Sequence, residues 1–349
     1  MPEIVGWCQV TNARRLLQFP WVDQQTVQTS VHEFPAVRPA ARLGVLLAVS
    51  LGLGTVSFAP NVGIAEPRRV STEAPAPDPT TAPPRSADLA DLRPPRVRAR
   101  AAMVYNPRTH EVLWERNGYR PRPIASITKV MTVLLFLEQD PNLTRDVVVS
   151  RRDVRRASTT YLRRGERILL RELVHLALVG SDNAAARVLA RVSPWGTRGF
   201  VEQMNRLAGE LGLAGTTFAD PSGLNKENVS TPYDVSRLIT YASEHAQVAE
   251  IMQKRTHRLR TSRQNRDVRN TNRLLLGRLN VLAGKTGYID AAGYCLATFV
   301  NIPGVPGGEP LAVVVLGVGS SAGRFRDVTR LVDWVADEGR SLLASSAAN

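Results

Sequence analysis

Three short motifs could together activate a serine for attack on a carbonyl carbon. In chain order they are Ser126-Ile127-Thr128-Lys129, Ser181-Asp182-Asn183 and Lys285-Thr286-Gly287. A serine hydroxyl becomes a good nucleophile only when a base takes its proton. Lysine can be that base if burial lowers its pKa, and arginine cannot. The chain has only four lysines among 45 Lys and Arg residues, and two of the four lie in these motifs.

The first motif places its serine and lysine on one face of a helix. The apolar spacing predicts a helix over residues 126–137, and residues three apart on a helix are neighbours, so the Lys129 amine can reach the Ser126 hydroxyl. Ser126 falls in the first turn, where a free backbone N–H faces incoming negative charge. The neighbours of Lys129 are largely apolar, which disfavours a solvated helix charge and favours a desolvated base.

The second motif lies where two predicted helices, residues 172–179 and 184–192, are interrupted. Ser, Asp and Asn all cap helices well, so an ordinary N-cap is one interpretation, and Asp182 could do only that. The functional interpretation is that Ser181 relays a proton to a leaving amine while Asn183 holds Lys129 and the substrate amide.

The third motif falls in a predicted strand, residues 281–288, where a lysine is uncommon unless the strand borders a cleft. Lys285 and Thr286 could grip a substrate carboxylate through a charge and a hydroxyl donor. A glycine at position 287 lets another backbone approach closely.

The elements that must position these motifs are predicted on either side of a helical region. Strands are expected at residues 101–105, 112–116, 281–288, 293–300 and 311–318. Further helices are expected at residues 200–211, 233–245 and 325–343. Strands at both ends of the domain with helices between them predict an α+β fold. In it, a mixed, mainly antiparallel sheet is flanked by helices, with a helical subdomain, and its first and last segments are neighbours.

The N-terminal third of the chain is predicted to be a leader and a linker. Residues 43–59 form an uncharged, mostly apolar run preceded by arginines and followed by small residues, which is the plan of a signal peptide. The predicted divisions are a gene-model extension or disordered segment (1–36), a signal peptide or N-terminal anchor (37–65), a proline-rich linker (66–96), a folded domain (97–345) and a tail (346–349). The protein is therefore expected to be exported, to the periplasm or the cell-envelope space.

Composition limits the other functional classes. The net charge is +14 and the hydrophobic fraction is 43 %, but the arginines are scattered and no zinc finger or RNP-like strand accompanies them, so we expect no specific nucleic-acid partner. Two cysteines and five histidines without metal-ligand spacing predict no metal. Cys295 is expected to be a small buried hydrophobe.

The ordered trio of motifs resembles the low-molecular-mass penicillin-binding proteins, which are D-alanyl-D-alanine carboxypeptidases and endopeptidases of the penicillin-recognising serine acyltransferases. The resemblance runs from about residue 97 to 343, with a β-lactamase/transpeptidase-like fold. Its supporting stretches are residues 125–132, 179–186, 220–224, 227–231, 270–275 and 284–296.

The resemblance implies a role for each motif residue. Ser126 is the acylated nucleophile, Lys129 its general base, and Ser181 and Asn183 complete the proton network. The substrate-binding residues implied are Lys285, Thr286, Gly287, Tyr288 (whose backbone N–H completes an oxyanion hole with that of Ser126) and Arg326 (which helps fix the terminal carboxylate). A surface arginine at the start of a helix is the other interpretation of Arg326. Neither a metal nor an organic cofactor is expected.

The same resemblance implies the partners and leaves alternatives open. Peptidoglycan stem peptides are the expected substrates, β-lactams the expected covalent inhibitors, and a membrane is contacted only through an uncleaved leader. Carboxypeptidase and endopeptidase both remain possible. A class A-like β-lactamase is an alternative, although the candidate glutamates Glu202 and Glu210 lack the expected Glu-x-x-Leu-Asn setting. A non-catalytic wall-binding module is another.

Overall fold

The computed structural model describes residues 94–302 and 309–347, with side chains as far as residue 338. Its strands are β1 (Ala101–Asn106), β2 (Glu111–Arg116), β3 (Arg122–Pro123), β4 (Asp146–Val148), β5 (Arg167–Leu169), β6 (Val229–Ser230), β7 (Thr256–Arg260), β8 (Asn265–Arg269), β9 (Asn280–Ile289), β10 (Gly293–Asn301) and β11 (Pro310–Val318). Its helices are α2 (Thr128–Leu137), α3 (Arg151–Val154), α4 (Leu170–Leu178), α5 (Asn183–Val192), α6 (Gly196–Glu210), α7 (Pro232–Glu244), α8 (Ala246–Gln253) and α9 (Ser321–Ala347), with 3-10 turns η3 (Ala125–Ile127) and η4 (Arg273–Leu276).

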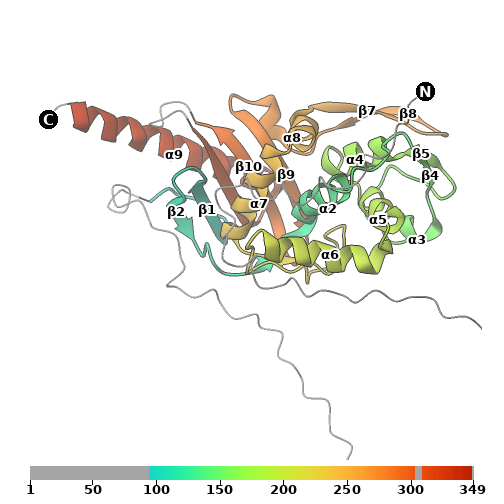
Figure 1. Cartoon of the computed structure of the whole chain (residues 1–349). Coiled ribbons are helices and arrows are strands. Elements are labelled where there is room, and N and C mark those ends of the chain that lie inside the picture. The colour runs from blue at the N-terminus through green and yellow to red at the C-terminus, as the bar shows by residue number, and fades with distance from the viewer. Residues whose placement is uncertain (1–93, 303–308, 348–349) are drawn as a thin grey trace, which may run out of the picture. The chain divides into compact units, whose positions relative to one another are not determined.

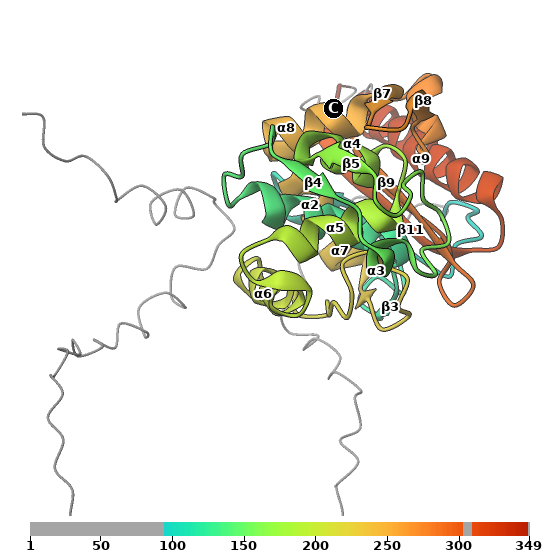
Figure 2. The same cartoon turned by 90° about the vertical axis from the view of Figure 1, so that its right-hand side faces the viewer.

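A five-stranded antiparallel sheet organises the described domain. Its strand order is β2-β1-β11-β10-β9, so the first and last strands of the domain are hydrogen-bonded neighbours. The helical subdomain, with α2, α4, α5 and α6, lies beyond β9 (Figures 1 and 2). The edge strand β9 therefore carries the third motif to the border between the two parts.

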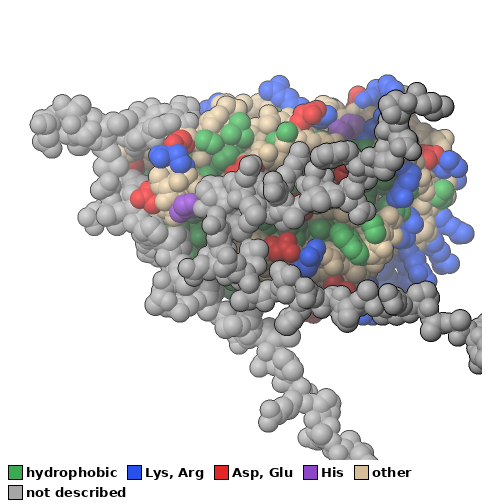
Figure 3. Space-filling model, viewed as in Figure 1, with side chains coloured by type: hydrophobic (Ala, Val, Ile, Leu, Met, Phe, Trp, Pro, Cys, Tyr) green, Lys and Arg blue, Asp and Glu red, His purple; other side chains and the backbone are tan. Residues whose placement is uncertain are grey.

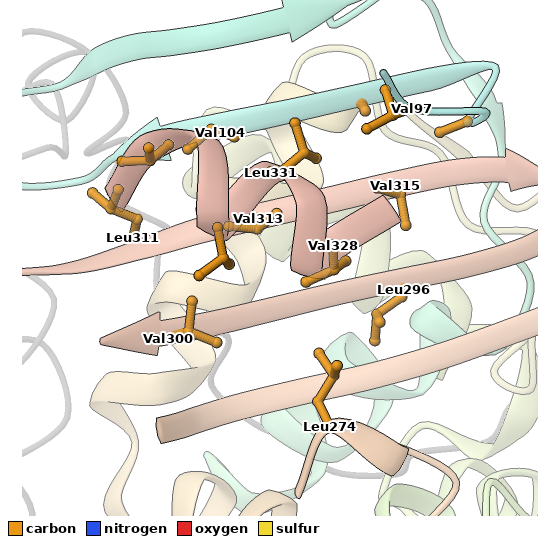
Figure 4. Packing of buried hydrophobic residues seen from close by; sticks show 14 of the residues in the cluster. Val97, Val104, Leu274, Leu296, Val300, Leu311, Val313, Val315, Val328 and Leu331 are labelled. Carbon is orange, nitrogen blue, oxygen red and sulfur yellow. The ribbon is translucent and has the colours of Figure 1, made fainter. Parts of the chain in front are cut away.

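Both faces of the sheet are covered, which explains why β11 is apolar at almost every position. Leu311, Val313 and Val315 pack with Val328 and Leu331 of α9 in one buried cluster (Figure 4). Helix α7 contacts β1, β10 and β11 from the other side. Alternate residues of one strand thus belong to two different cores.

Helix α2 is buried along its whole length, with all ten of its residues buried. It contacts α4, α5, α6 and α7. Most of its side chains are apolar, which suits a helix that is surrounded by other elements. The helix that carries the first motif is therefore held from every side.

The expected strands and helices are confirmed, with ends shifted by a few residues, as is the expected sheet. The sequence analysis did not anticipate α8 or the β7–β8 hairpin. That hairpin is a two-stranded sheet of its own whose strands carry only two buried residues, Leu259 and Val268. With so few buried apolar residues, the sequence of the hairpin lacks the hydrophobic alternation by which strands are predicted.

The predictions for residues 1–36, 37–65 and nearly all of 66–96 lie outside the described residues. In the part of the chain that the structure describes, no helix is long and apolar enough to cross a membrane.

Candidate active site

The serine of the first motif sits in a 3-10 turn just before α2 rather than in the first turn of the helix itself. Ala125 in that turn has a positive φ of 49°. The Lys129 Nζ donates a hydrogen bond to Ser126 Oγ at 2.8 Å, as the spacing of three residues predicts. The nucleophile and its candidate base are thus in direct contact.

The amine of Lys129 is fully buried and has two further oxygen acceptors. It donates to Asn183 Oδ1 at 2.6 Å and to the Ser222 carbonyl at 2.5 Å. Burial lowers the pKa of Lys129 from 10.5 to about 7, against the opposing effect of the Asp182 and Asp220 carboxylates. Near neutral pH a large fraction of this amine is therefore uncharged and able to accept a proton.

The loop after α6 presents the Ser222 carbonyl to the lysine. The carboxylate of Asp220 accepts hydrogen bonds from the backbone N–H groups of Ser222 (2.5 Å), Gly223 (2.8 Å) and Asn225 (2.5 Å). Gly223 has a φ of +80°, and a Cβ there would lie 2.0 Å from the Ala125 carbonyl oxygen. Only glycine fits this position, because the loop presses on the backbone that carries the nucleophile.

The second motif connects the two lysines of the site. Asp182 caps α5 by accepting from Ala185 N at 2.9 Å, so its predicted capping role is confirmed. Asn183 uses its carbonyl for Lys129 and donates its amide to the Ala157 carbonyl at 2.7 Å. Ser181, at φ +56°, points its hydroxyl the other way and accepts from Lys285 Nζ at 2.7 Å.

The third motif lies on β9, facing the serine. Lys285 is buried (1 % exposed), and burial together with the nearby Lys129 and Arg324 charges holds its pKa well below the usual value. Thr286 Oγ1 donates to Thr271 Oγ1 at 2.7 Å. A Cβ on Gly287 would lie 3.1 Å from Ser126 N. The absent side chain therefore lets β9 run alongside the serine backbone, as predicted.

Residues of all three motifs line one cleft of the described domain. Its walls come from η3, the loop before Tyr161, the second motif and the end of β9. The lining residues are Ser126, Ser158, Thr159, Gly180, Ser181, Asn183, Leu224, Thr271, Thr286, Gly287, Tyr288, Ile289, Asp290 and Arg324. Tyr288 is 47 % exposed and its ring stacks on that of Tyr294 at 4.3 Å. The cleft is thus polar around the serine and aromatic at one edge.

The structure does not place Arg326 among the residues that line the cleft, and the arginine that lines it is Arg324. Arg326 is exposed. The two residues are separated by about 200° around α9, because each residue of a helix turns by about 100°. Arg324 donates to the Gly287 carbonyl at 3.2 Å, and its buried Nε has no hydrogen-bond partner among the described residues.

Other candidate groups lie away from the cleft or are inert. Glu202 and Glu210 are on α6 and pair with Arg198 and Arg206. Asp290 is the only carboxylate among the residues that line the cleft. Cys295 is buried and its thiol pKa is raised to about 11 by burial. Within residues 94–302 and 309–347, no group of three or more His, Cys, Asp or Glu side chains is placed to hold a metal ion.

Sequence reasoning did not assign Arg324, the Ser222 carbonyl, Thr271 or Asp290 to the site. Ser222 and Thr271 fall within stretches that carry the family resemblance, so a signal existed for their importance but not for their roles. Nothing local distinguishes Arg324 from the other arginines of α9.

Comparison with known proteins agrees with this geometry. A family model described as peptidase S11, D-alanyl-D-alanine carboxypeptidase, matches residues 89–320, which include all three motifs. The chain belongs to the D-alanyl-D-alanine carboxypeptidase family. The predicted resemblance is therefore confirmed, as is the prediction that the chain is a serine-type D,D-peptidase.

Relatives of this carboxypeptidase-family chain include enzymes of two named activities. The D-alanyl-D-alanine endopeptidase of Pseudomonas aeruginosa is 33 % identical over 67 % of this chain and 76 % of the relative. The endopeptidase of Escherichia coli is 31 % identical over 69 % of this chain and 78 % of the relative. The carboxypeptidase DacF of Bacillus subtilis is 28 % identical over 68 % of this chain and 61 % of the relative.

Solved structures confirm the fold class of the family member described here. Penicillin-binding protein D2 from Listeria monocytogenes, in its cefotaxime-bound form, superposes with a TM-score of 0.61 at 29 % identity, over 71 % of this chain and 99 % of that one. The D-alanyl-D-alanine carboxypeptidase of Mycobacterium tuberculosis H37Rv gives a TM-score of 0.64 at 25 % identity, over 71 % of this chain and 95 % of that one. The β-lactamase/transpeptidase-like α+β fold is thus confirmed.

Proposed function

We propose that this D,D-peptidase hydrolyses D-alanyl cross-bridges of peptidoglycan as an endopeptidase, through an acyl-enzyme on Ser126. The observation that carries the mechanism is the buried Lys129 amine, 2.8 Å from Ser126 Oγ, with a pKa of about 7. A base whose pKa lies near the operating pH takes and returns protons most effectively.

Acylation follows from the contacts around the serine. In its neutral form the Lys129 amine keeps two N–H donors for Asn183 Oδ1 and the Ser222 carbonyl, and its lone pair accepts from the Ser126 hydroxyl. Ser126 Oγ then bonds to the carbonyl carbon of the substrate's D-alanine while its proton moves to Lys129 Nζ. In this proposal the oxygen of the tetrahedral intermediate accepts from the backbone N–H groups of Ser126 and Tyr288. Donors fixed in advance at such an oxygen commonly supply the largest single share of catalysis. Collapse breaks the C–N bond and leaves the acyl group on Ser126.

The leaving amine receives its proton from the other half of the network. Lys285 Nζ donates to Ser181 Oγ at 2.7 Å, so the hydroxyl's own hydrogen is free to point into the cleft that Ser181 lines. Ser181 then donates to the departing nitrogen, and Lys285 can replace that proton because its pKa is lowered. In the second half-reaction water attacks the acyl carbon, and its proton passes through Ser181 to the now neutral Lys285. The bond between the acyl carbon and Ser126 Oγ breaks, and the protonated Lys129 amine returns its proton to Ser126 Oγ.

We expect a substrate carboxylate beside the scissile bond to bind at the part of the cleft that Thr286 and Arg324 line. The hydroxyl of Thr286 and the guanidinium of Arg324 both line the cleft. A guanidinium carries a fixed positive charge and several N–H donors that match a carboxylate. We assign these two residues to carboxylate binding, in place of Arg326.

Two observations support the endopeptidase activity over the alternatives. Three endopeptidase relatives are 31–33 % identical to this chain, whereas the carboxypeptidase relatives compared are 26–29 % identical. A class A-like β-lactamase needs a carboxylate that activates the deacylating water. The only cleft-lining carboxylate, Asp290, accepts from the Tyr288 hydroxyl at 2.7 Å, and Glu202 and Glu210 are elsewhere.

Export to the cell envelope and covalent inhibition by β-lactams belong to the same proposal. The substrate lies outside the cytoplasm, and the cefotaxime-bound relative shares this fold. A β-lactam ring is a cyclic amide that Ser126 could open by the acylation step above.

The test is a mass-spectrometric digest of two purified substrates by the full chain. One is the disaccharide pentapeptide and the other is its cross-linked dimer, each also incubated with the Ser126→Ala variant. Conversion of dimer to monomers supports the endopeptidase. Loss of only the terminal D-alanine from the pentapeptide would make the chain a carboxypeptidase. No change beyond the Ser126→Ala control would overturn the enzymatic function and favour a wall-binding module.

A further inference from the structure

Two segments at the rim of the cleft carry a high density of exposed arginine. Residues 155–166 include Arg155, Arg156, Arg163 and Arg164, and residues 261–269, which span the tip of the β7–β8 hairpin, include three more arginines. All seven are exposed: Arg155, Arg156, Arg163, Arg164, Arg263, Arg266 and Arg269. We call this set the arginine rim. Blue side chains gather at the end of the domain where β4, β5 and the hairpin tip lie (Figure 3).

The two segments form one surface, because hydrogen bonds hold them together. Ser262 N donates to the Arg167 carbonyl at 3.0 Å, and Gln264 Nε2 donates to the Tyr161 carbonyl at 2.7 Å. The buried carboxylate of Glu166 accepts from Arg163 N at 2.8 Å and from Gln264 Nε2 at 2.9 Å. The arginines are thus presented from a fixed scaffold rather than from independent loops.

The positive charge of the arginine rim is not neutralised locally. The two segments contain two carboxylates: Glu166, which is fully buried, and Asp267, which is exposed and pairs with Arg258 of β7. No arginine of the rim has an ion-pair partner among the described residues. A surface with this many unpaired positive charges attracts anions.

The arginine rim is continuous with the cleft. Ser158 and Thr159 belong to the first segment and line the cleft, and Thr271 lines it two residues beyond Arg269. Asn183 N donates to the Thr159 carbonyl at 3.1 Å, which attaches this segment to the second catalytic motif. An occupant of the rim would therefore lie beside the peptide bound in the cleft.

The chemistry of the arginine rim favours a flexible polyanion over a membrane or a nucleic acid. The apolar residues Ala157, Leu162 and Val268 are buried, so nothing in the two segments can insert into a bilayer. The one aromatic ring, that of Tyr161, is covered by the guanidinium of Arg266 at 5.0 Å, so no free ring is available for base stacking. Guanidinium groups do match the oxygens of phosphodiesters.

We propose that the arginine rim is a docking site for a phosphodiester-bearing glycopolymer of the cell wall, which holds the enzyme beside wall-linked substrate. The identity of this partner rests on the proposed action on peptidoglycan, but its binding does not require catalysis. The two can therefore be tested separately.

The experiment measures co-sedimentation of the full chain carrying Ser126→Ala with isolated bacterial walls. One set of walls keeps its phosphodiester polymer, and a second has been stripped of it with hydrofluoric acid. The rim variant combines Arg163→Gln, Arg164→Gln, Arg263→Gln and Arg266→Gln. A control variant removes the same charge from exposed, ion-paired arginines remote in sequence from the rim, at Arg108, Arg198, Arg206 and Arg278.

At low salt we expect the chain to bind intact walls about tenfold or more tightly than stripped walls. Most of this difference in affinity should be lost at 200 mM salt, because guanidinium–phosphate contacts release counterions. The rim variant loses the difference, and the control variant keeps it. Both variants, made with Ser126 intact, cleave soluble cross-linked dimer at the unmodified rate.

Three results would overturn the proposal. The first is equal binding to intact and stripped walls, and the second is unchanged wall binding by the rim variant. The third is binding of duplex DNA or acidic phospholipid vesicles as tightly as intact walls, which would assign the surface to another class of partner. Failure to cleave soluble dimer by the otherwise unmodified chain would count against the proposed endopeptidase, not against this site.

Discussion

Replacing Lys129 by methionine tests whether the buried amine is neutral, without relying on activity. The folded chain places this amine out of contact with water, and burial lowers its pKa from 10.5 to about 7. The unfolded chain returns it to water and to its ordinary pKa. Methionine fills a similar volume and carries no proton at any pH.

The magnitude follows from proton linkage. Between pH 7 and pH 10.5 the unfolded chain binds the Lys129 proton and the folded chain releases it. The free energy of unfolding of the unmodified chain therefore rises with pH, by up to about 1.4 kcal/mol per unit from this group. The Lys129→Met variant lacks that rise. From pH 7 to pH 9 the stability of the variant relative to the unmodified chain should fall by about 2 kcal/mol.

The assay is urea unfolding of the full chains, followed by circular dichroism at pH 7, 8 and 9. Hydrogen bonds lost to methionine shift the curve by a constant amount, so only the slope with pH reports the proton. Lys226→Met is the matched control, because Lys226 is exposed and its removal should leave the slope unchanged. In parallel, kcat/KM of the unmodified chain should rise with pH through an apparent pKa of about 7. Parallel stability profiles for Lys129→Met and the unmodified chain would show that Lys129 keeps its proton when folded and is not the base.

Three further predictions concern the residues around this amine. Ser126→Ala should abolish acylation by a fluorescent penicillin and leave the circular dichroism spectrum unchanged. Lys129→Arg should also fail to acylate, because it keeps the charge but loses the base. Labelling of either variant at the normal rate would contradict the assigned roles. Arg324→Gln should raise KM for a substrate with a free carboxylate about tenfold or more, because it removes a charged contact from the cleft. Arg326→Gln, on the exposed side of α9, should leave KM unchanged. Equal effects of the two changes would refute the assignment. Gly223→Ala should destabilise the chain by about 3 kcal/mol or more in thermal unfolding, because position 223 has a positive φ and its Cβ would clash with the Ala125 carbonyl. Gly209→Ala on α6 is the control. A Cβ there meets no other atom, so this change should be neutral or slightly stabilising.

The sequence determined those parts of the site that depend on local geometry. The contact between Ser126 and Lys129 is fixed by three-residue spacing on a helical turn, and the capping role of Asp182 by its place before α5. The main strands were readable because apolar runs in a buried sheet are long and continuous. Residue identity also indicated the chemistry, since lysine is rare in a chain that otherwise uses arginine.

Only the tertiary structure decided which distant groups complete the site. The carbonyl of Ser222 lies 93 residues from Lys129 along the chain, and a backbone carbonyl leaves no trace in residue identity. Arg324 and Arg326 are the same residue type two positions apart, and the packing of α9 on the sheet determines which one lines the cleft. The arginine rim likewise exists because hydrogen bonds join a loop to a hairpin about 100 residues away. Local spacing fixes contacts within a turn, but burial, charge neighbourhood and the pKa of Lys129 depend on what the rest of the chain packs around it.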